Sequence, residues 1–382
     1  MRRAPRRIRL LAHTLGLVAF LAGPLLACGA LLGLDDIAYD AADAGATLDA
    51  SSGGDSAGES ALDGGAADQA SADALATDAA QDGPFSVAVG LGLPQALAID
   101  QTNLYWLNSI GAGLGSVQSM RKDGTGPMTT YATNQPSPLD IAVAGDSVYW
   151  SVNQSPPAPA QVQCLAMTTS KDGGAPACVT SGAFASVRMT TNGAYVVVLS
   201  RAAANDFIGF GLPDGGYQNV QAQGVSQAIT ATSTNIFLGN PNGIHIDELT
   251  FPALGFLAPV CTSGCGATTI LDITVDVTGA SLLWITQGGV FTEPTAPTNA
   301  TGTQLATLPA AGQRIARDAS YAYVTTAQSV IAVPLSGKDA GAPVLTLASG
   351  EASPFGIAVD DEHVYWTDGN GSIRATSVPA PP

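Results

Sequence analysis

Residues 357–366 read IAVDDEHVYW: a short apolar run, a polar turn and a second run that ends in two aromatic residues. Alternation of apolar and polar positions, together with β-branched and aromatic side chains, favours two strands over a helix. Six further ten-residue windows share this pattern. They are LAIDQTNLYW (97–106), IAVAGDSVYW (141–150), VRMTTNGAYV (187–196), ITATSTNIFL (229–238), VDVTGASLLW (275–284) and IARDASYAYV (315–324).

The spacing of these windows indicates the architecture. Their last residues fall at 106, 150, 196, 238, 284, 324 and 366, so one repeat is about 43 residues long, a period typical of propeller blades rather than helical repeats. In several copies a third strand, an Asp-Gly turn and a fourth strand follow the window. We therefore predict an all-β fold, a seven-bladed β-propeller of four-stranded blades that spans residues 85–382.

The two ends of the array complement each other. The seventh copy runs out after its third strand, whereas residues 85–90 precede the first copy and match a fourth strand. Gly90 precedes Leu97 by seven residues, and Gly350 precedes Ile357 by the same interval. We expect strand 85–90 to complete the last blade and close the ring, which would leave only short sheet edges exposed.

The run Tyr365-Trp366-Thr367-Asp368 resembles the YWTD repeat of low-density-lipoprotein-receptor-type propellers. The resemblance implies a propeller over residues 85–382 and no particular ligand, and it departs from that family, whose propellers have six blades. We expect the recurring aromatic residues to pack between neighbouring blades, with a carbohydrate-stacking platform as the alternative. They are Tyr105, Trp106, Tyr149, Trp150, Trp284, Tyr365 and Trp366.

The N-terminus has the features of an export signal. Five arginines within the first nine residues precede an apolar run over residues 10–26, and a membrane-spanning helix, the alternative, needs roughly 20 apolar residues. The run Leu25-Leu26-Ala27-Cys28 resembles a bacterial lipobox. We expect residues 1–27 to be a lipoprotein signal peptide and Cys28 to carry acyl chains. Gly29 favours sorting to the outer membrane or cell surface.

Residues 28–84 are expected to form a disordered tether. Between Asp35 and Asp82 there are eleven Asp, one Glu and no Lys or Arg, and most other residues are Ala, Gly and Ser. Such a segment buries too little apolar surface to offset its ordering entropy. The whole chain carries a formal charge of −17, and a surface of this sign repels nucleic-acid phosphates, so nucleic-acid binding is excluded.

The remaining cysteines form an even set in a compartment that permits disulfides. Cys164 and Cys178 flank a Lys-Asp-Gly-Gly turn, as expected for facing positions on a hairpin, and Cys261 and Cys265 enclose three residues. We expect two disulfides. The alternative, a four-cysteine zinc site, lacks paired C-x₂-C spacing.

The sequence contains no motif that assigns a catalytic, metal or cofactor site. Asp100, Asp360 and Asp368 could be metal ligands, but we interpret them as turn and strand-end residues. His245 and His363 are interpreted as a strand residue and a turn residue. The first strand of each copy is mostly Ala, Ile, Val and Thr, which predicts a central channel with little chemistry.

The combination of anchor, spacer and rigid platform predicts an interaction scaffold that binds an envelope protein or glycan as a monomer. The loops at 152–160 and 292–303 are the expected contact regions, because loop variation is a common source of specificity. Fold alone does not exclude catalysis. The alternative is therefore a propeller-type hydrolase or lyase that acts on a sugar or lactone.

Overall fold

The computed structural model describes residues 83–382, with gaps at 112, 154–162, 183–184, 193–194, 202–205, 212–216, 223–225, 240–245, 251–268, 277, 296–301 and 336–342. The expected signal peptide, Cys28 and nearly all of the tether lie outside these residues. Every element in the described part is a β-strand. No helix there is long and apolar enough to cross a membrane.

Seven antiparallel sheets account for the described strands, six with four strands and one with three. The first three sheets in chain order are β2 (Leu93–Ile99), β3 (Asn103–Gly111), β4 (Leu114–Arg121) and β5 (Thr129–Pro136); β6 (Ile141–Ala144), β7 (Ser147–Ser151), β8 (Gln163–Ser170) and β9 (Ala177–Gly182); and β10 (Ala185–Thr191), β11 (Val196–Arg201), β12 (Asp206–Gly211) and β13 (Tyr217–Ala222).

The next three sheets are β14 (Ala228–Ala231), β15 (Asn235–Gly239) and β16 (Ile246–Thr250); β17 (Asp272–Val275), β18 (Ser281–Ile285), β19 (Gly289–Pro294) and β20 (Thr303–Thr307); and β21 (Gly312–Arg317), β22 (Tyr321–Thr326), β23 (Ser329–Pro334) and β24 (Leu345–Ser349). The last sheet contains β25 (Ile357–Val359), β26 (His363–Asp368), β27 (Ser372–Ser377) and the N-terminal strand β1 (Phe85–Ala88).

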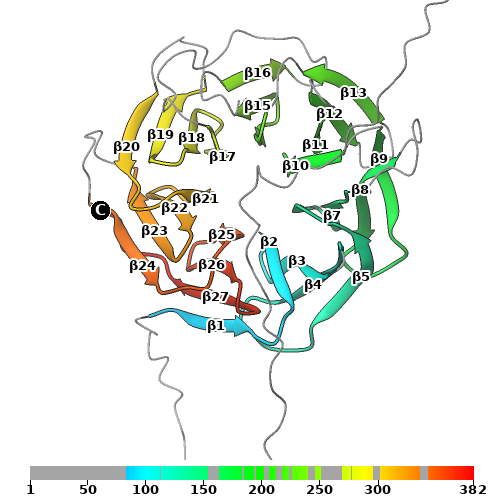
Figure 1. The fold of residues 1–382 in the computed structure, drawn as a ribbon, viewed down its shortest axis with the longest axis horizontal. Coiled ribbons are helices and arrows are strands. Elements are labelled where there is room, and N and C mark those ends of the chain that lie inside the picture. The colour runs from blue at the N-terminus through cyan, green and yellow to red at the C-terminus, as the bar shows by residue number, and fades with distance from the viewer. Residues whose placement is uncertain are drawn as a thin grey trace, which may run out of the picture. The chain divides into compact units, whose positions relative to one another are not determined.

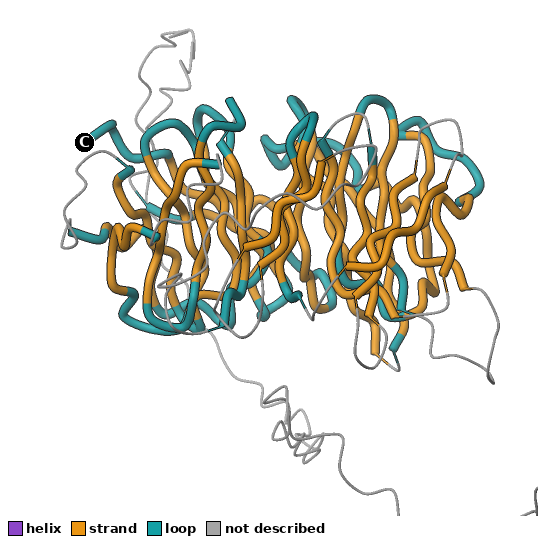
Figure 2. Tube along the Cα trace, turned by 90° about the horizontal axis from the view of Figure 1, so that it is seen from above, coloured by secondary structure: helices purple, strands orange, loops and turns teal. Residues whose placement is uncertain are grey.

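The sheets lie around a common centre, each with its first strand innermost (Figure 1). The first strands of successive sheets contact one another, and β25 of the last sheet contacts β2 of the first. Loops lie at both ends of the strands (Figure 2). The first and last segments meet because β1 pairs antiparallel with β27, with Phe85 opposite Ala375.

Apolar clusters fill the spaces between neighbouring sheets. In one cluster Trp150 packs against Tyr105 and Val117 of the preceding sheet, and in another Trp366 packs against Tyr323 of its preceding sheet. Trp106 lies against residues of the last sheet, Tyr365 among them. Trp284 and Tyr149 occupy the corresponding clusters between other sheets. The recurring aromatic residues thus lie between sheets and are buried.

Three of these tryptophans differ in the hydrogen bond of the indole N–H. Trp150 Nε1 donates to Gln135 Oε1 at 2.9 Å, and Trp366 Nε1 donates to Glu351 Oε2 at 2.9 Å. Among the described residues, Trp106 Nε1 is buried without a partner. Gln135 and Glu351 have equivalent positions: each follows a residue with positive φ near the end of the fourth strand of the preceding sheet. For Trp106 the preceding sheet is the last one, and the residue at the equivalent position is Leu91. An apolar side chain supplies no acceptor.

Strand pairing corrects the predicted alignment of two repeats. Ile141 pairs with Trp150, and the equivalent pair in the third sheet is Met189 with Val198, two residues later than the window at 187–196 implies. In the fifth sheet Ile273 pairs with Trp284, so the turn is two residues longer than in the window at 275–284. The longer turn shifted the window of the fifth sheet against its strands, whereas Met189 and Val198 have the same separation as Ile141 and Trp150, so the whole window of the third sheet was placed two residues too early.

Candidate functional site: the central cavity

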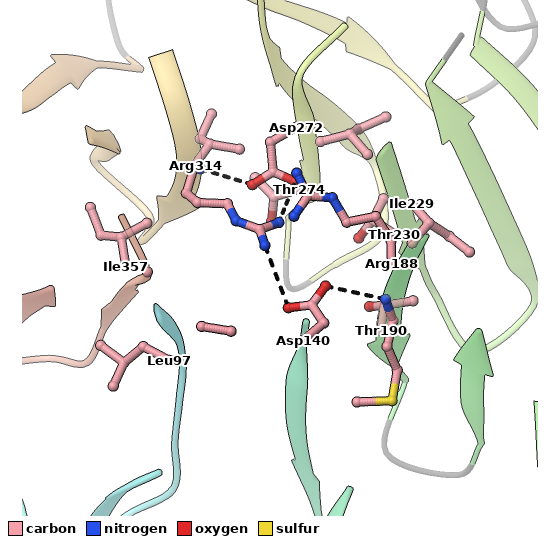
Figure 3. A pocket seen from close by; sticks show the side chains of 15 residues that line it. Leu97, Asp140, Arg188, Thr190, Ile229, Thr230, Asp272, Thr274, Arg314 and Ile357 are labelled. Atoms are coloured by element: carbon pink, nitrogen blue, oxygen red, sulfur yellow. Dashed lines mark hydrogen bonds and ion pairs between the residues drawn. The ribbon is translucent and has the colours of Figure 1, made fainter. Parts of the chain in front are cut away.

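Residues on the first strands of the seven sheets, or directly before them, line a central cavity of about 240 Å³. Its wall contains aliphatic and threonine side chains, as predicted, but also four charged ones: Asp140, Arg188, Asp272 and Arg314. All four lie close together in Figure 3. The prediction of a channel with little chemistry is therefore wrong.

The four charged residues occupy one repeated position. Each precedes the residue that pairs with the tryptophan or its equivalent on the second strand, for example Asp140 before Ile141 and Arg314 before Ile315. Around the ring this position holds Ala96, Asp140, Arg188, Ala228, Asp272, Arg314 and Gly356. An acidic residue is thus followed by a basic residue in the next sheet, twice, with small residues between.

Each aspartate is held by the neighbouring sheet. Asp140 Oδ2 accepts a hydrogen bond from the backbone N–H of Met189 at 3.2 Å. Asp272 Oδ2 accepts one from the backbone N–H of Ile315 at 3.1 Å. These bonds fix both carboxylates at the cavity wall, and they join the second sheet to the third and the fifth to the sixth.

Arg188 is fixed by backbone carbonyl groups. Its Nε donates to the oxygen of Gln227 at 3.1 Å, and its Nη2 donates to the oxygen of Leu271 at 3.4 Å. To reach Leu271, the side chain passes the fourth sheet, where the equivalent position holds the small Ala228. The guanidinium is therefore a positioned charge beside Asp272 (Figure 3).

Arg314 is held more loosely. Its side chain is 10% exposed, and its guanidinium lies 4.8 Å from the centre of the Phe355 ring. The nearest carboxylate oxygens are those of Asp140 at 3.8 Å and Asp272 at 3.9 Å, whereas charge-assisted hydrogen bonds are about 2.7–2.9 Å long. Among the described residues its guanidinium makes no hydrogen bond, so its donors face the cavity.

The sheet that follows Arg314 has Gly356 at the repeated position. A Cβ atom there would lie 2.2 Å from the oxygen of Gln95, far inside van der Waals contact. The two sheets approach each other closely at this point. A larger residue could not replace this glycine without displacing the strands.

Burial in the cavity wall changes the pKa of both aspartates. Burial in the cavity wall raises the pKa of Asp272 to about 6, against the opposing influence of the Arg188 charge. Burial likewise raises the pKa of Asp140, although Arg188 and the Met189 N–H oppose the shift. Desolvation favours the neutral form of a carboxyl group. The cavity therefore contains two cations, of which Arg188 is fixed, and two acids that accept a proton readily.

The sequence contained a signal for this site. Asp140 and Arg314 stand directly before their windows, so extending each window by one residue would have exposed them. Arg188 lay inside the misaligned third window. Asp272 was separated from its window by the longer turn.

The aspartates singled out from the sequence lie elsewhere. Asp100 Oδ1 accepts hydrogen bonds from the backbone N–H groups of Thr102 and Asn103 at 2.8 Å each. Its Oδ2 accepts one from the Tyr105 hydroxyl at 2.8 Å and lies 2.7 Å from Lys171 Nζ in the next sheet. Although burial opposes it, these hydrogen bonds lower the pKa of Asp100.

Asp360 caps the corresponding turn of the last sheet and pairs with Lys122 Nζ at 2.5 Å. Asp368 accepts hydrogen bonds from the backbone N–H groups of Asn370 and Ala352, both at 3.0 Å. All three carboxylates thus make turn or strand-end contacts. Among the described residues, no group of three His, Cys, Asp or Glu side chains could hold a metal ion.

The other candidates are dispersed. Cys164 on β8 and Cys178 on β9 form a disulfide with Cα atoms 5.8 Å apart, although Cys178 stands opposite Met167 rather than opposite Cys164. Cys261, Cys265 and His245 lie outside the described residues, as do most of the two expected contact loops. His363 is the first residue of β26 rather than a turn residue, and its ring lies 5.6 Å from that of Phe85.

Comparisons with known proteins support the fold. No protein-family model matches the sequence, and no curated protein matches it. A solved structure of a catalytically inactive virginiamycin B lyase from Staphylococcus aureus with quinupristin is 13% identical, with a TM-score of 0.62 over 78% of this chain and 98% of that one. The computationally designed Ika8 protein is 10% identical, with a TM-score of 0.53 over 77% and 98%. The chain therefore has an all-β, propeller-like fold.

Proposed function

We propose that this chain is a seven-bladed β-propeller, closed by β1, that acts as a lipid-anchored extracytoplasmic binding protein. The blade count is supported by the seven described sheets, and closure is supported by the pairing of β1 with β27 and by the contact of β25 with β2. The anchor at Cys28, the signal peptide over residues 1–27 and the tether over residues 28–84 are proposed from the sequence features alone.

The ligand site is the central cavity, and Arg314 is the observation that carries this proposal. A guanidinium that is nine-tenths buried normally has hydrogen-bond partners, because an unpaired buried polar group is costly. Here the nearest carboxylate oxygens, those of Asp140 and Asp272, are beyond hydrogen-bond distance from the guanidinium, whose donors face the cavity. A polar ligand would supply the missing acceptors.

The volume limits what can enter. Sites for drug-sized ligands measure about 300–1,000 Å³, and this cavity measures about 240 Å³. It suits a single polar group or the end of an oligosaccharide. Of the partners expected from the sequence, a glycan with its terminal residue in the cavity fits this volume better than a protein.

A glycan array probed with the purified full chain tests the proposal. We expect binding of defined glycans by the wild type and its loss in Arg314→Met, which keeps the side-chain length but removes the donors. The matched control is Arg121→Ala, because Arg121 is an exposed residue that pairs with Asp123 at the surface. Circular dichroism would verify that both variants fold. Equal binding by all three proteins would refute the cavity as the site.

A second candidate function is that of a lyase, which the similarity to virginiamycin B lyase favours. At 13% identity this similarity concerns the fold, so the activity is an alternative proposal. Mass spectrometry of each bound glycan after incubation distinguishes the two. Fragments that depend on active protein and disappear in Arg314→Met would indicate a lyase or hydrolase, whereas recovery of intact ligand would indicate a binding protein.

A further inference from the structure

The charges of the cavity identify the chemistry of its ligand more closely than its volume does. Arg188 and Arg314 carry two positive charges, and Asp140 and Asp272 can carry two negative ones. With both acids ionised the cavity is neutral. No other charged or titratable side chain lines it within the described residues.

The free donors of Arg314 match a carboxylate. A guanidinium presents two parallel N–H groups, which a carboxylate accepts in a bidentate arrangement, whereas a sugar hydroxyl can accept only one of them well. The guanidinium lies over the Phe355 ring, 4.8 Å from its centre. Arg188 is fixed by the carbonyl groups of Gln227 and Leu271 and adds a second positive charge at the same wall.

A carboxylate that entered the neutral cavity would bring an uncompensated buried charge close to Asp140 and Asp272. Buried like charges a few ångströms apart do not coexist readily, and such a pair commonly retains a proton. Asp272 faces Arg188 from β10, Arg314 from β21 and Asp140, which directly precedes β6 (Figure 3). Protonation of either acid restores neutrality when the ligand is bound.

We propose that the cavity selects a carboxylate-bearing ligand, such as a uronic acid at the end of a glycan, and that binding takes up one proton on the Asp140–Asp272 pair. The ligand carboxylate accepts hydrogen bonds from Arg314, and the proton enters from solvent. The raised pKa values of both acids are consistent with this exchange at neutral pH. The inference rests on the proposed function, since it specifies the ligand of the same cavity.

Calorimetry with D-glucuronate and D-glucose tests the inference, because the two probes differ only in the carboxylate at C6. We expect at least about tenfold tighter binding of glucuronate, a ratio worth about 1.4 kcal/mol. The binding enthalpies measured in phosphate and in Tris at pH 7 should differ by the difference between the ionisation enthalpies of the two buffers, as expected when one proton is taken up. Above about pH 6 the affinity should fall by up to about tenfold per pH unit, as expected when binding requires one proton.

The variant Asp272→Asn provides a gain of function. Its amide mimics the protonated acid, so we expect tighter glucuronate binding at pH 8 than in the wild type and a weaker dependence on pH. Arg314→Met should remove the preference for glucuronate, whereas Arg121→Ala should leave it unchanged.

The outcomes separate the two proposals. Equal affinity for glucuronate and glucose, or glucuronate binding without proton uptake, would overturn the carboxylate inference and leave a neutral-glycan site standing. If neither glucuronate nor glucose binds, the inference that the cavity binds a uronic acid is overturned. A glycan array that also shows no binding would then refute the proposed function itself.

Discussion

Three of the four tryptophans at the sheet interfaces provide an internal comparison of one hydrogen bond. Trp106, Trp150 and Trp366 have equivalent places on the second strands of their sheets and are fully buried. Substitution by Phe removes the indole N–H at each of the three positions, together with a similar side-chain volume. We predict that Trp366→Phe lowers the free energy of unfolding most, Trp150→Phe less, and Trp106→Phe least.

The magnitudes follow from the partners. A hydrogen bond to a neutral acceptor contributes about 1 kcal/mol and one to a charged acceptor about 1.5–3 kcal/mol, so Trp366, which donates to Glu351, has more to lose than Trp150, which donates to Gln135. Trp106 Nε1 has no partner among the described residues, and removing a buried unpaired donor recovers about 1–3 kcal/mol. Trp366→Phe should therefore be about 2.5–6 kcal/mol more destabilising than Trp106→Phe.

Urea denaturation followed by circular dichroism measures these differences, provided that the m-values of the three variants agree with that of the wild type. Equal destabilisation by Trp106→Phe and Trp366→Phe would refute the reasoning. A further test uses Leu91→Gln, which places an acceptor where Gln135 and Glu351 have theirs. In that background Trp106→Phe should become about 2–4 kcal/mol more costly, because it then breaks a hydrogen bond instead of removing an unpaired donor, and no coupling in the double-mutant cycle would contradict the equivalence of Leu91 with those residues.

Three further predictions concern single contacts. Because the folded protein holds a proton on Asp272 that the unfolded chain releases, its free energy of unfolding should fall as the pH rises from 3.8 to about 6, by up to about 3 kcal/mol. Urea titrations across that range should show a smaller fall in Asp272→Asn. Arg374→Met should cost about 3 kcal/mol, because it leaves Glu351, whose side chain is 2% exposed, without its ion pair; an unchanged urea midpoint would contradict this. Reduction of Cys164–Cys178, 14 residues apart, should cost about 2–3 kcal/mol in the same assay, whereas the double Ser variant should be insensitive to reductant.

The architecture could be predicted from the sequence because its signal is repeated. Pairs such as Tyr149-Trp150 and Tyr365-Trp366 recur at one place in the pattern, and the structure places them between sheets. The expected fourth strand at 85–90 is present as β1, paired with β27. An interface that recurs between sheets favours similar apolar side chains at the same place in each copy, and such a repeated pattern can be recognised in the sequence.

The charged site could not be recognised in the same way, because its residues differ from copy to copy. Ala96, Asp140 and Arg188 occupy one repeated position, but their chemistry has no common pattern. These residues can be recognised as one charged site only in the folded chain, where side chains from different sheets line the same cavity. The turn before Ser281 adds a second difficulty, since its extra length hides Asp272 from a fixed window.

The pairing of β1 with β27 imposes an order on folding. Phe85 is synthesised long before its partner Ala375, with the strands of the other six sheets between them. Hairpins such as β2–β3 can pair as soon as they appear, whereas β1 must wait until nearly the whole domain exists. Until then its edge is open to other strands, and the chain is most exposed to aggregation. A chain terminated before Ser372 would never leave that state.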